Sequence, residues 1–526
     1  MSKKNDNPKN ILKTVALVAM ILTFVAEAVF SIQLLVLNML PLAYSLLIIL
    51  VLVLIPVLMA LAIHRGGKKP LRYIVILVLT VVIASGCIFG SVALGKLQST
   101  LNAITGQKED TNIYVGVYVR AENPAADIKD AKGYTFAFTA EERTWDPQEA
   151  IQGISLLTDT TISTKEYDTV FAVADALKSG EVDAALINVA YTELFEDVEG
   201  YEGFLTETRL LYEHAVKELE IPDIVNPWEE DPEDTEPTEP TDPTEPTEPT
   251  APTEKMAVDP FILYLSGSDT RSSTLRKSRT DVNILAVVNP NTHQILLINT
   301  PRDYYVVLGG TKDSMDKLTH STMYSMKTAI RTMEKLYGCE VSYYARINFS
   351  GFEKLIDAIG GIDIHSDIKF ITDDDIWIYE GNNHLNGEAA LSFARERHHL
   401  KGGDNARGKN QMKVIAAVVD KVTSGTTIIT KYAEILESLG GMFTTDMPTE
   451  KMAELVQFQL TEMPKWEIYS YAVTGVGAHE FTYSIPTAKT YVMKPNKSTV
   501  KHAKSLIKSV LKGEVLTEED MTTSKS

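Results

Sequence analysis

The chain has 526 residues, of which 44% are hydrophobic and 23% are charged. This length suggests two or three domains, and the composition excludes a wholly disordered or fibrous protein. The formal net charge of -20 argues against a surface that coats nucleic acid. The two cysteines, Cys87 and Cys339, are too far apart to suggest a disulfide framework or a cysteine-based metal site.

Three apolar runs near the N-terminus each reach the roughly 20 residues that a helix needs to cross about 30 Å of hydrocarbon. The runs are residues 12–37, 41–63 and 73–94. We predict a three-helix transmembrane anchor over residues 1–96, because three spans in a row do not fit a cleavable signal peptide. Lysines and arginines precede the first run and fill the turn between the second and third, whereas the turn near Asn38 has none. The positive-inside rule therefore places the N-terminus inside and everything after Gly95 outside.

Glu27 lies in the middle of the first run, where a carboxyl group is costly. A protonated or hydrogen-bonded structural role explains this residue better than transport, because no second intramembrane acid accompanies it. Its role stays open.

Residues 223–255 form an acidic Pro-Thr-Glu repeat, in which residues 223–254 hold 12 acids and no lysine or arginine. The global acidity is therefore mainly a property of this segment. A Pro-rich segment of like charge is extended and semi-rigid, and at about 3.1 Å per residue it reaches at most about 100 Å. We interpret it as a linker between two extracytoplasmic domains.

Residues 112–220 alternate strands with helices, which predicts a small extracytoplasmic α/β accessory domain. Strands are expected over Tyr114–Val119 and Tyr134–Phe138, and a helix that ends at Gly180 leads into a buried strand ending at Ile187. This order resembles one lobe of the periplasmic solute-binding proteins. Such proteins close two lobes around a ligand, so an interaction or spacing role is favoured over ligand capture.

In the C-terminal half, charged residues follow predicted strands. Strands are expected over Phe261–Leu265, Asp281–Val288 and His293–Asn299, and the last two form a hairpin. Asp269 comes shortly after the first strand and Arg302 shortly after the third. Charged side chains at strand ends are how α/β folds build sites.

Two predicted helices supply further charges. One ends in Arg395 and Arg397, and Asp404 opens another that places Arg407 and Gln411 on the same face. The cations are Arg302, Lys317, Arg395, Arg397 and Arg407, and the acids are Asp269, Asp281 and Asp404. Arginine matches phosphate oxygens bidentately, and carboxylates without His or Cys partners favour Mg²⁺. These residues predict extracytoplasmic phosphoryl-group chemistry, with ordinary surface salt bridges as the alternative for any single residue.

Six strings, SGSDTR, SRTD, TPRD, DKLTHS, ARER and DNARGKNQ, occur in this order between residues 256 and 515. They resemble the LytR-CpsA-Psr family of cell-wall glycopolymer transferases, and the anchor with an accessory domain resembles its capsule-associated members. The resemblance implies a C-terminal α/β/α catalytic domain with a central mixed sheet over residues 256–515. It also implies a Mg-dependent phosphotransferase that moves a polyprenyl-pyrophosphate-linked capsular polysaccharide or teichoic acid onto peptidoglycan and releases polyprenyl phosphate.

Position by position, the resemblance implies that Asp269 and Asp281 hold Mg²⁺, with Mn²⁺ as the alternative ion. The implied pyrophosphate-binding residues are Arg302, Lys317, Arg395, Arg397, Arg407 and Gln411. The implied catalytic residues are Asp281, Arg302, Asp404, Arg395 and Arg397. Either Asp404 or Asp281 would accept the proton of the attacking hydroxyl. The chain departs from the family where Asn410 replaces a common arginine and where Asn299 and Thr300 replace a common Ser-Ile pair.

The expected partners are the lipid-linked donor, the peptidoglycan acceptor, the membrane and capsule-assembly proteins, with no nucleic acid. The expected location is the cell membrane of a Gram-positive bacterium, with the C-terminal domains on the extracellular side. Two other functions stay open: a non-enzymatic regulator that binds lipid diphosphate or polysaccharide, and a polyprenyl-pyrophosphate hydrolase. One apolar set could line a lipid groove or form plain core, and it comprises Ile362, Ile364, Phe370, Ile371, Ile376 and Trp377. A disordered tail is expected over residues 516–526.

Overall fold

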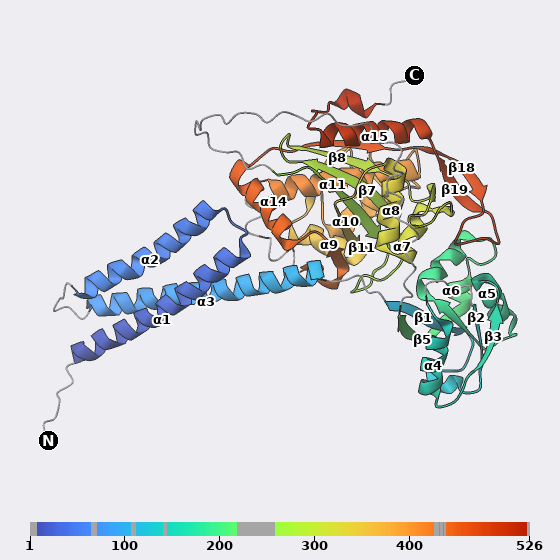
Figure 1. The fold of residues 1–526 in the computed structure, drawn as a ribbon, viewed down its shortest axis with the longest axis horizontal. Coiled ribbons are helices and arrows are strands. Elements are labelled where there is room, and N and C mark those ends of the chain that lie inside the picture. The colour runs from blue at the N-terminus through green and yellow to red at the C-terminus, as the bar shows by residue number, and fades with distance from the viewer. Residues whose placement is uncertain are drawn as a thin grey trace, which may run out of the picture.

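The computed structural model describes residues 8–64, 71–106, 112–139, 145–217, 258–424, 431, 435 and 438–522. In chain order it contains three long apolar helices, a small α/β domain and a larger α/β/α domain (Figure 1). The acidic linker predicted over residues 223–255 lies outside the described residues.

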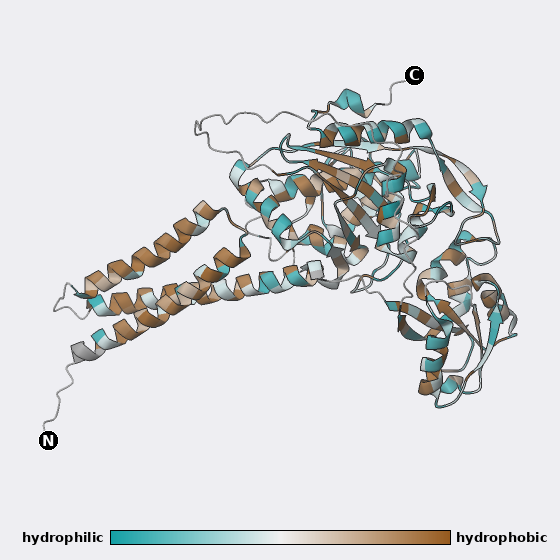
Figure 2. Ribbon diagram, viewed as in Figure 1, coloured by the Kyte–Doolittle hydropathy of each residue, from teal (hydrophilic) through white to brown (hydrophobic). Residues whose placement is uncertain are grey.

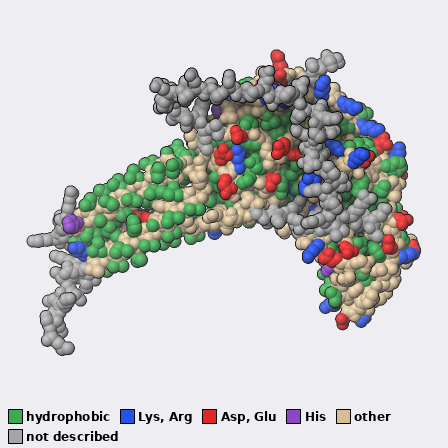
Figure 3. Space-filling view, in the orientation of Figure 1, with side chains coloured by type: hydrophobic (Ala, Val, Ile, Leu, Met, Phe, Trp, Pro, Cys, Tyr) green, Lys and Arg blue, Asp and Glu red, His purple; other side chains and the backbone are tan. Residues whose placement is uncertain are grey.

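The anchor consists of α1 (Pro8–Leu37), α2 (Leu42–His64) and α3 (Leu71–Gly106). All three are long and apolar enough to cross a membrane, which confirms the three predicted spans. Hydrophobic residues make up most of each helix (Figure 2), and hydrophobic side chains cover the face of the anchor that Figure 3 shows, as expected for helices solvated by lipid.

The third helix is longer than a membrane requires. Its apolar stretch of 35 residues is about 50 Å long at about 1.5 Å per residue, whereas the hydrocarbon core is about 30 Å thick. The excess at its C-terminal end is buried against the large domain, where Leu101 and Ile104 pack with Ala453. The anchor therefore contacts the large domain directly.

The accessory domain is built on a five-stranded sheet of order β3-β2-β4-β1-β5. Its strands are β1 (Asn112–Arg120), β2 (Thr135–Thr139), β3 (Ser163–Tyr167), β4 (Ala184–Asn188) and β5 (Thr208–Lys217). Its helices are α4 (Pro147–Thr158), α5 (Val170–Ser179) and α6 (Phe204–Glu207), with 3-10 turns η1 (Ile128–Ala131) and η2 (Val189–Asp197). The predicted helix end is confirmed, because Gly180 caps α5 with a φ of 78° that a glycine adopts readily.

The large domain has a mixed six-stranded sheet of order β16-β11-β6-β7-β8-β17. Its strands are β6 (Phe261–Ser268), β7 (Val282–Asn289), β8 (Gln294–Asn299), β11 (Tyr343–Asn348), β16 (Phe443–Thr445) and β17 (Glu467–Ala472). The predicted hairpin is confirmed by the antiparallel pairing of β7 with β8. Four small two-stranded ladders surround the sheet: β9 (Tyr305–Val307) with β10 (Met315–Lys317), β12 (Ile362–Ser366) with β15 (Gly381–Leu385), β13 (Phe370–Ile371) with β14 (Trp377–Ile378), and β18 (Gly475–Glu480) with β19 (Thr490–Pro495).

Helices cover both faces of this sheet, and the side-chain alternation of β7 shows why. Leu285 and Val287 enter one core with residues of α8 (Met326–Tyr337) and α15 (Lys497–Leu511). Ile284 and Ala286 enter a second core with Met412 of α11 (Asp404–Thr423). A strand buried on both faces reads as a continuous apolar run, as this one does. The other helical segments of this domain are η3 (Leu318–His320), α7 (Ser321–Tyr324), α9 (Phe349–Ala358), α10 (Gly387–Arg395), η4 (Gly440–Met442), α14 (Thr449–Glu462) and η5 (Glu518–Met521).

One expectation needs correction. The tail predicted to be disordered from residue 516 is ordered through residue 522, because Leu516 is buried, its N–H donates to Gln294 Oε1 at 2.7 Å, and η5 follows with a capping box. Residues 523–526 lie outside the described residues. Of the residues for which a lipid groove and plain core stayed open, Ile362, Ile364 and Phe370 belong to a buried core, and Trp377 is half exposed.

Candidate functional site

Strand pairing brings three charged loops to one edge of the large sheet. Because β7 is antiparallel to both β6 and β8, the ends of β6 and β8 lie beside the start of β7. Asp269 follows β6, Asp281 precedes β7 and Arg302 follows β8. The Asp281 N–H donates to the carbonyl of Gly267 at 2.8 Å, which fixes the start of β7 against the end of β6.

Arg302 and Arg407 lie among the carboxylates of this edge. Arg302 Nη1 donates to Asp281 Oδ1 at 2.9 Å, and its Nε lies 3.7 Å from Asp303 Oδ2. Arg407 pairs with Asp404 one turn earlier on α11. The Arg407 charge also acts on Asp281 and Arg302, so α11 contributes to the same cluster as β7 and β8.

Gly408 explains how α11 comes so close to the sheet. A Cβ at this position would collide with the side-chain amide of Asn299, the last residue of β8. A larger residue would fit only if the Asn299 side chain shifted. The close approach carries the neighbouring Arg407 to the end of β8.

Lys317 joins the cluster from the β9–β10 ladder. Its Nζ lies 3.8 Å from Asp303 Oδ1 and 2.9 Å from Asp197 Oδ2, and its side chain is 3% exposed. Asp197 belongs to η2 of the accessory domain. Asp197 of the accessory domain is therefore the nearest ion-pair partner of Lys317, a residue predicted to bind pyrophosphate.

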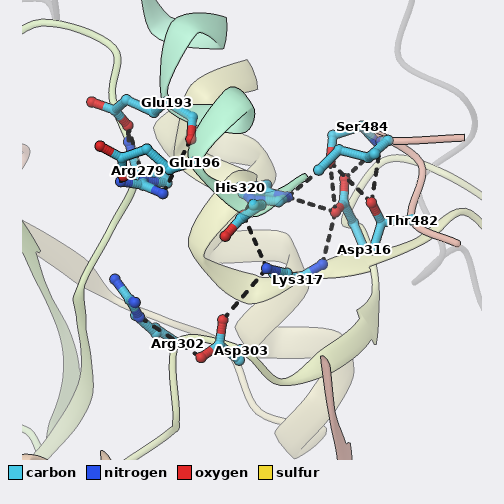
Figure 4. Close-up of polar contacts among 12 residues, drawn as sticks. Glu193, Glu196, Arg279, Arg302, Asp303, Asp316, Lys317, His320, Thr482 and Ser484 are labelled. Atoms are coloured by element: carbon cyan, nitrogen blue, oxygen red, sulfur yellow. Dashed lines mark hydrogen bonds and ion pairs between the residues drawn. The ribbon is translucent and has the colours of Figure 1, made fainter. Parts of the chain in front are cut away.

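Arg279 is enclosed by the same 3-10 turn of the accessory domain (Figure 4). The main-chain N–H of Arg279 donates to Glu193 Oε2 at 3.0 Å, and its Nη2 donates to Glu196 Oε2 at 2.7 Å. The Arg279 Nη2 also lies 3.8 Å from Asp269 Oδ2. Arg279 thus connects η2 to a carboxylate of the β6 loop.

His320 extends the network behind Lys317 and is fully buried. Its Nδ1 lies 2.8 Å from Asp316 Oδ1 and 2.8 Å from Ser484 Oγ, and its Nε2 lies 3.2 Å from Asp197 Oδ2. Burial alone would lower the pKa of His320, but the charge of Asp316 and the hydrogen bond with Asp197 raise it. His320 is therefore held in its charged form more strongly than an exposed histidine.

The carboxyl groups of the cluster differ in their proton affinity. Burial would raise the pKa of Asp281, but the charges of Arg302 and Arg407 outweigh burial and lower it. Burial, and then the charge of Asp281, raise the pKa of Asp269. Burial would also raise the pKa of Asp197, but the hydrogen bond from His320 and the charge of Lys317 hold it well below its ordinary value. Asp281 and Asp197 are the firmly ionised members.

The donor set at this edge fits a hard divalent cation. Asp269 and Asp281 offer oxygen ligands, and the negative charge of each disfavours ionisation of the other. A divalent cation between two such carboxylates would relieve that repulsion, and oxygen is the ligand that Mg²⁺ prefers. These two residues could therefore hold the predicted ion.

Of the other residues predicted to bind pyrophosphate, Arg397 and Gln411 lie near Arg407, whereas Arg395 does not join the cluster. The Arg397 charge acts on Arg407, and Gln411 is buried one turn after Arg407 on α11. Arg395 faces elsewhere among the described residues, because its guanidinium carbon lies 4.9 Å from the Phe349 ring centre and its Nη1 lies 3.5 Å from Asp374 Oδ2.

Sequence reasoning missed several residues of the cluster. Arg279, Asp303 and His320 belong to the strings SRTD, TPRD and DKLTHS. Their position near Asp281, Arg302 and Lys317 could have identified them as residues of the site. The acids of η2 carry no motif. Glu193 lies 86 residues from Arg279 and Asp197 lies 123 residues from His320, and nothing in the sequence pairs them.

The fold and this cluster define an α/β/α domain that gathers arginine, lysine and carboxylate side chains at one edge of a mixed sheet. Residues 230–502, just over half of the chain, match the sequence profile of the LytR_cpsA_psr family, and the chain belongs to this family.

Curated relatives include proteins named polyisoprenyl-teichoic acid--peptidoglycan teichoic acid transferase TagU. The protein from Bacillus cereus is 31% identical over 198 residues, and that from Enterococcus faecalis is 34% identical over 200 residues. Each match covers 38% of this chain but only 64% and 65% of the relative, which is less than two thirds of its length. Among solved structures, that of B. subtilis TagV is 24% identical with a TM-score of 0.41, and the match covers 50% of this chain and 100% of that one.

Proposed function

We propose that this protein transfers a glycopolymer from a polyprenyl-pyrophosphate-linked donor to peptidoglycan on the outer face of the cell membrane. The observation that carries the proposal is the convergence of Arg302, Arg407 and Lys317 with Asp269 and Asp281 at one sheet edge. Three cations from three separate segments match the several oxygens of a diphosphate. Family membership and the names of the TagU relatives support the same reaction class.

The proposed step forms one bond and breaks one bond. A sugar hydroxyl oxygen of peptidoglycan bonds to the phosphorus that carries the glycan, while the bond from that phosphorus to the bridging oxygen breaks. The bridging oxygen leaves with polyprenyl phosphate, and the hydroxyl proton passes to a carboxylate. Arg302, Arg407 and Lys317 would neutralise the charge on the phosphate oxygens, which is the main task of a protein in such transfers. The lowered pKa of Asp281 makes it a weak proton acceptor. Asp404 is the other carboxylate proposed for that role.

Asp269 and Asp281 would hold the proposed Mg²⁺. The ion supplies positive charge at the diphosphate when it is bound. The Arg302 hydrogen bond occupies one Asp281 oxygen at 2.9 Å and leaves the other available.

The anchor supports a site that works close to the membrane. The extracellular end of α3 packs against the large domain at Ala453, so the domain that carries the cluster is held beside the helices that would cross the bilayer. We propose that the two outer domains face the cell wall of a Gram-positive bacterium, and that the polymer is of the capsular or teichoic-acid type, delivered by its assembly proteins.

The test uses the full chain in lipid nanodiscs, with a polyprenyl-pyrophosphate-linked glycan and peptidoglycan oligomers, with and without Mg²⁺. Arg302→Ala should lower the transfer rate by about 100-fold or more, because loss of one electrostatic stabiliser of a transition state costs about that much. Arg271→Ala is the matched control, since Arg271 is an exposed arginine of the string SGSDTR that pairs with Glu353 outside the cluster.

Each alternative function has its own outcome in this assay. Donor binding without product at any Mg²⁺ concentration would leave a lipid-diphosphate-binding regulator. Release of polyprenyl phosphate without coupling to peptidoglycan would indicate a hydrolase. Equal loss of transfer in the Arg302 and Arg271 variants would contradict the location of the site.

A further inference from the structure

The accessory domain places three carboxylates on the cations of the large domain. Glu193, Glu196 and Asp197 lie on η2, and their contacts with the large domain define what we call the acidic face of η2. Glu193 and Glu196 contact Arg279, and Asp197 contacts Lys317 and His320. Glu193 and Glu196 thus lie against Arg279 (Figure 4), while Asp197 reaches Lys317 of the predicted donor site.

This contact is a packed interface rather than an approach of surface charges. Met323 of α7 and Ile485 are fully buried within the apolar core of the accessory domain. At its edge, Arg276 Nη1 pairs with Glu213 Oε2 at 2.8 Å, and the guanidinium carbon of Arg276 lies 4.2 Å from the centre of the Tyr114 ring. Apolar burial and ion pairs thus act together to hold the two domains.

The charge balance at this interface opposes a diphosphate. The large domain already sets Asp269, Asp281 and Asp303 beside its own cations. The accessory domain adds three more acids, and a diphosphate would bring further negative charge to the same cations. A carboxylate oxygen at 2.9 Å from Lys317 Nζ occupies a position that a phosphate oxygen would take on that ammonium group. With a side chain only 3% exposed, Lys317 has little remaining surface for a second anion.

We propose that the acidic face of η2 is an internal ligand of the donor site, which the donor diphosphate displaces from Lys317 and Arg279 as it binds. This inference rests on the proposed function. The structure is then the closed form, and donor binding and accessory-domain docking oppose each other. The accessory domain acts as a gate that opens for a ligand with enough negative charge to compete for both cations.

Coupling of this kind has a measurable consequence. The apparent affinity of a site that is open for only a fraction of the time falls by that fraction. A substitution that weakens docking should therefore raise the affinity for a diphosphate. The coupling is reciprocal, so a diphosphate should also loosen the accessory domain.

The experiment measures binding of inorganic pyrophosphate, with Mg²⁺, to the full chain in nanodiscs by titration calorimetry. Asp197→Asn should raise the affinity by about tenfold or more, because it removes the ion pair that closes the site. Glu199→Gln is the matched control, since it makes the same charge change two residues later at an exposed position. It should leave the affinity unchanged.

A second variant separates gating from a local charge effect. Glu213→Gln removes the pair with Arg276 at the interface edge, away from Lys317, and should also raise the affinity. In the unmodified chain, pyrophosphate should increase amide hydrogen exchange across η2. Unchanged or weaker binding in both the Asp197 and Glu213 variants, or slower exchange of η2 with pyrophosphate, would overturn the gate and indicate that Asp197 positions Lys317 for binding.

A third variant distinguishes this failure from failure of the proposed function. Arg407→Ala should weaken pyrophosphate binding in every background, because Arg407 lies in the cluster and its ion pair is with Asp404 of its own helix. If pyrophosphate binds and depends on Arg407 but not on Asp197, the gate is wrong and the donor site stands. If neither the unmodified chain nor the Asp197 variant binds pyrophosphate, both the proposed donor site and the proposed gate are wrong.

Discussion

Replacing Glu193 by glutamine should strengthen accessory-domain docking at neutral pH, although it removes a negative charge that faces Arg279. Burial, and then the charge of Asp269, raise the pKa of Glu193 from its ordinary 4.5 to about 7. Each tenfold change in proton affinity corresponds to about 1.4 kcal/mol, so the charged form costs the docked state about 3 kcal/mol if the side chain regains its ordinary pKa on undocking. Glutamine stays neutral and avoids most of this cost. Because the Glu193 side chain is 21% exposed, solvent screening lowers the gain, and we expect docking to tighten by about tenfold to 100-fold.

Amide hydrogen exchange of η2 in the full chain measures this effect. Glu193→Gln should increase the protection of η2 at pH 7 and lower the apparent affinity for pyrophosphate by the same factor. Asp197→Asn makes the same chemical change on the same 3-10 helix and should act in the opposite direction, since the pKa of Asp197 is lowered by His320 and Lys317 despite its burial. If both substitutions changed protection in the same direction, the distinction between a crowded carboxylate at 193 and a paired one at 197 would be refuted.

Three further outcomes follow from particular contacts. Gly408→Ala should lower the thermal midpoint and weaken pyrophosphate binding, because its Cβ would collide with the Asn299 side chain, and a second substitution, Asn299→Ala, should restore both. The pKa of His320 is raised above 6.5 in the docked state, so charged His320 stabilises docking fully below pH 6.5. This stabilisation is lost as the pH rises through the raised pKa of His320. Protection of η2 from hydrogen exchange should therefore fall from pH 6 to pH 9. Leu101→Ala should cost about 2–5 kcal/mol of local packing and speed exchange in α14, while exchange in α8 stays unchanged.

The sheet edge that carries the cluster was predictable because its residues stand beside strands. Asp269, Asp281 and Arg302 each flank an apolar run, and the hairpin between the second and third runs forces two of them to one edge. The approach of α11 was less visible. Its helical spacing predicted that Arg407 and Gln411 share a face, but the contact of Gly408 with β8 depends on tertiary packing.

The role of the accessory domain could not be predicted from the sequence. Glu193 and Asp197 lie in a segment without a motif, and an acid on a short turn is normally a solvated surface residue. Their partners belong to another domain, beyond an acidic segment that suggested separation rather than contact. Arg395 was predicted to belong to the site, but its side chain lies against Phe349 instead. A string that matches a family identifies a residue type and not the direction of its side chain.

The central claim is transfer of a glycan phosphate, and the most direct measurement compares the amounts of two products. The full chain in nanodiscs would receive a polyprenyl-pyrophosphate-linked glycan and peptidoglycan oligomers, and mass spectrometry would quantify polyprenyl phosphate and the glycan joined to peptidoglycan through a phosphodiester. The account predicts equal molar amounts of both, and loss of both in Arg302→Ala. Polyprenyl phosphate without the coupled glycan, or neither product while the donor stays bound, would contradict it.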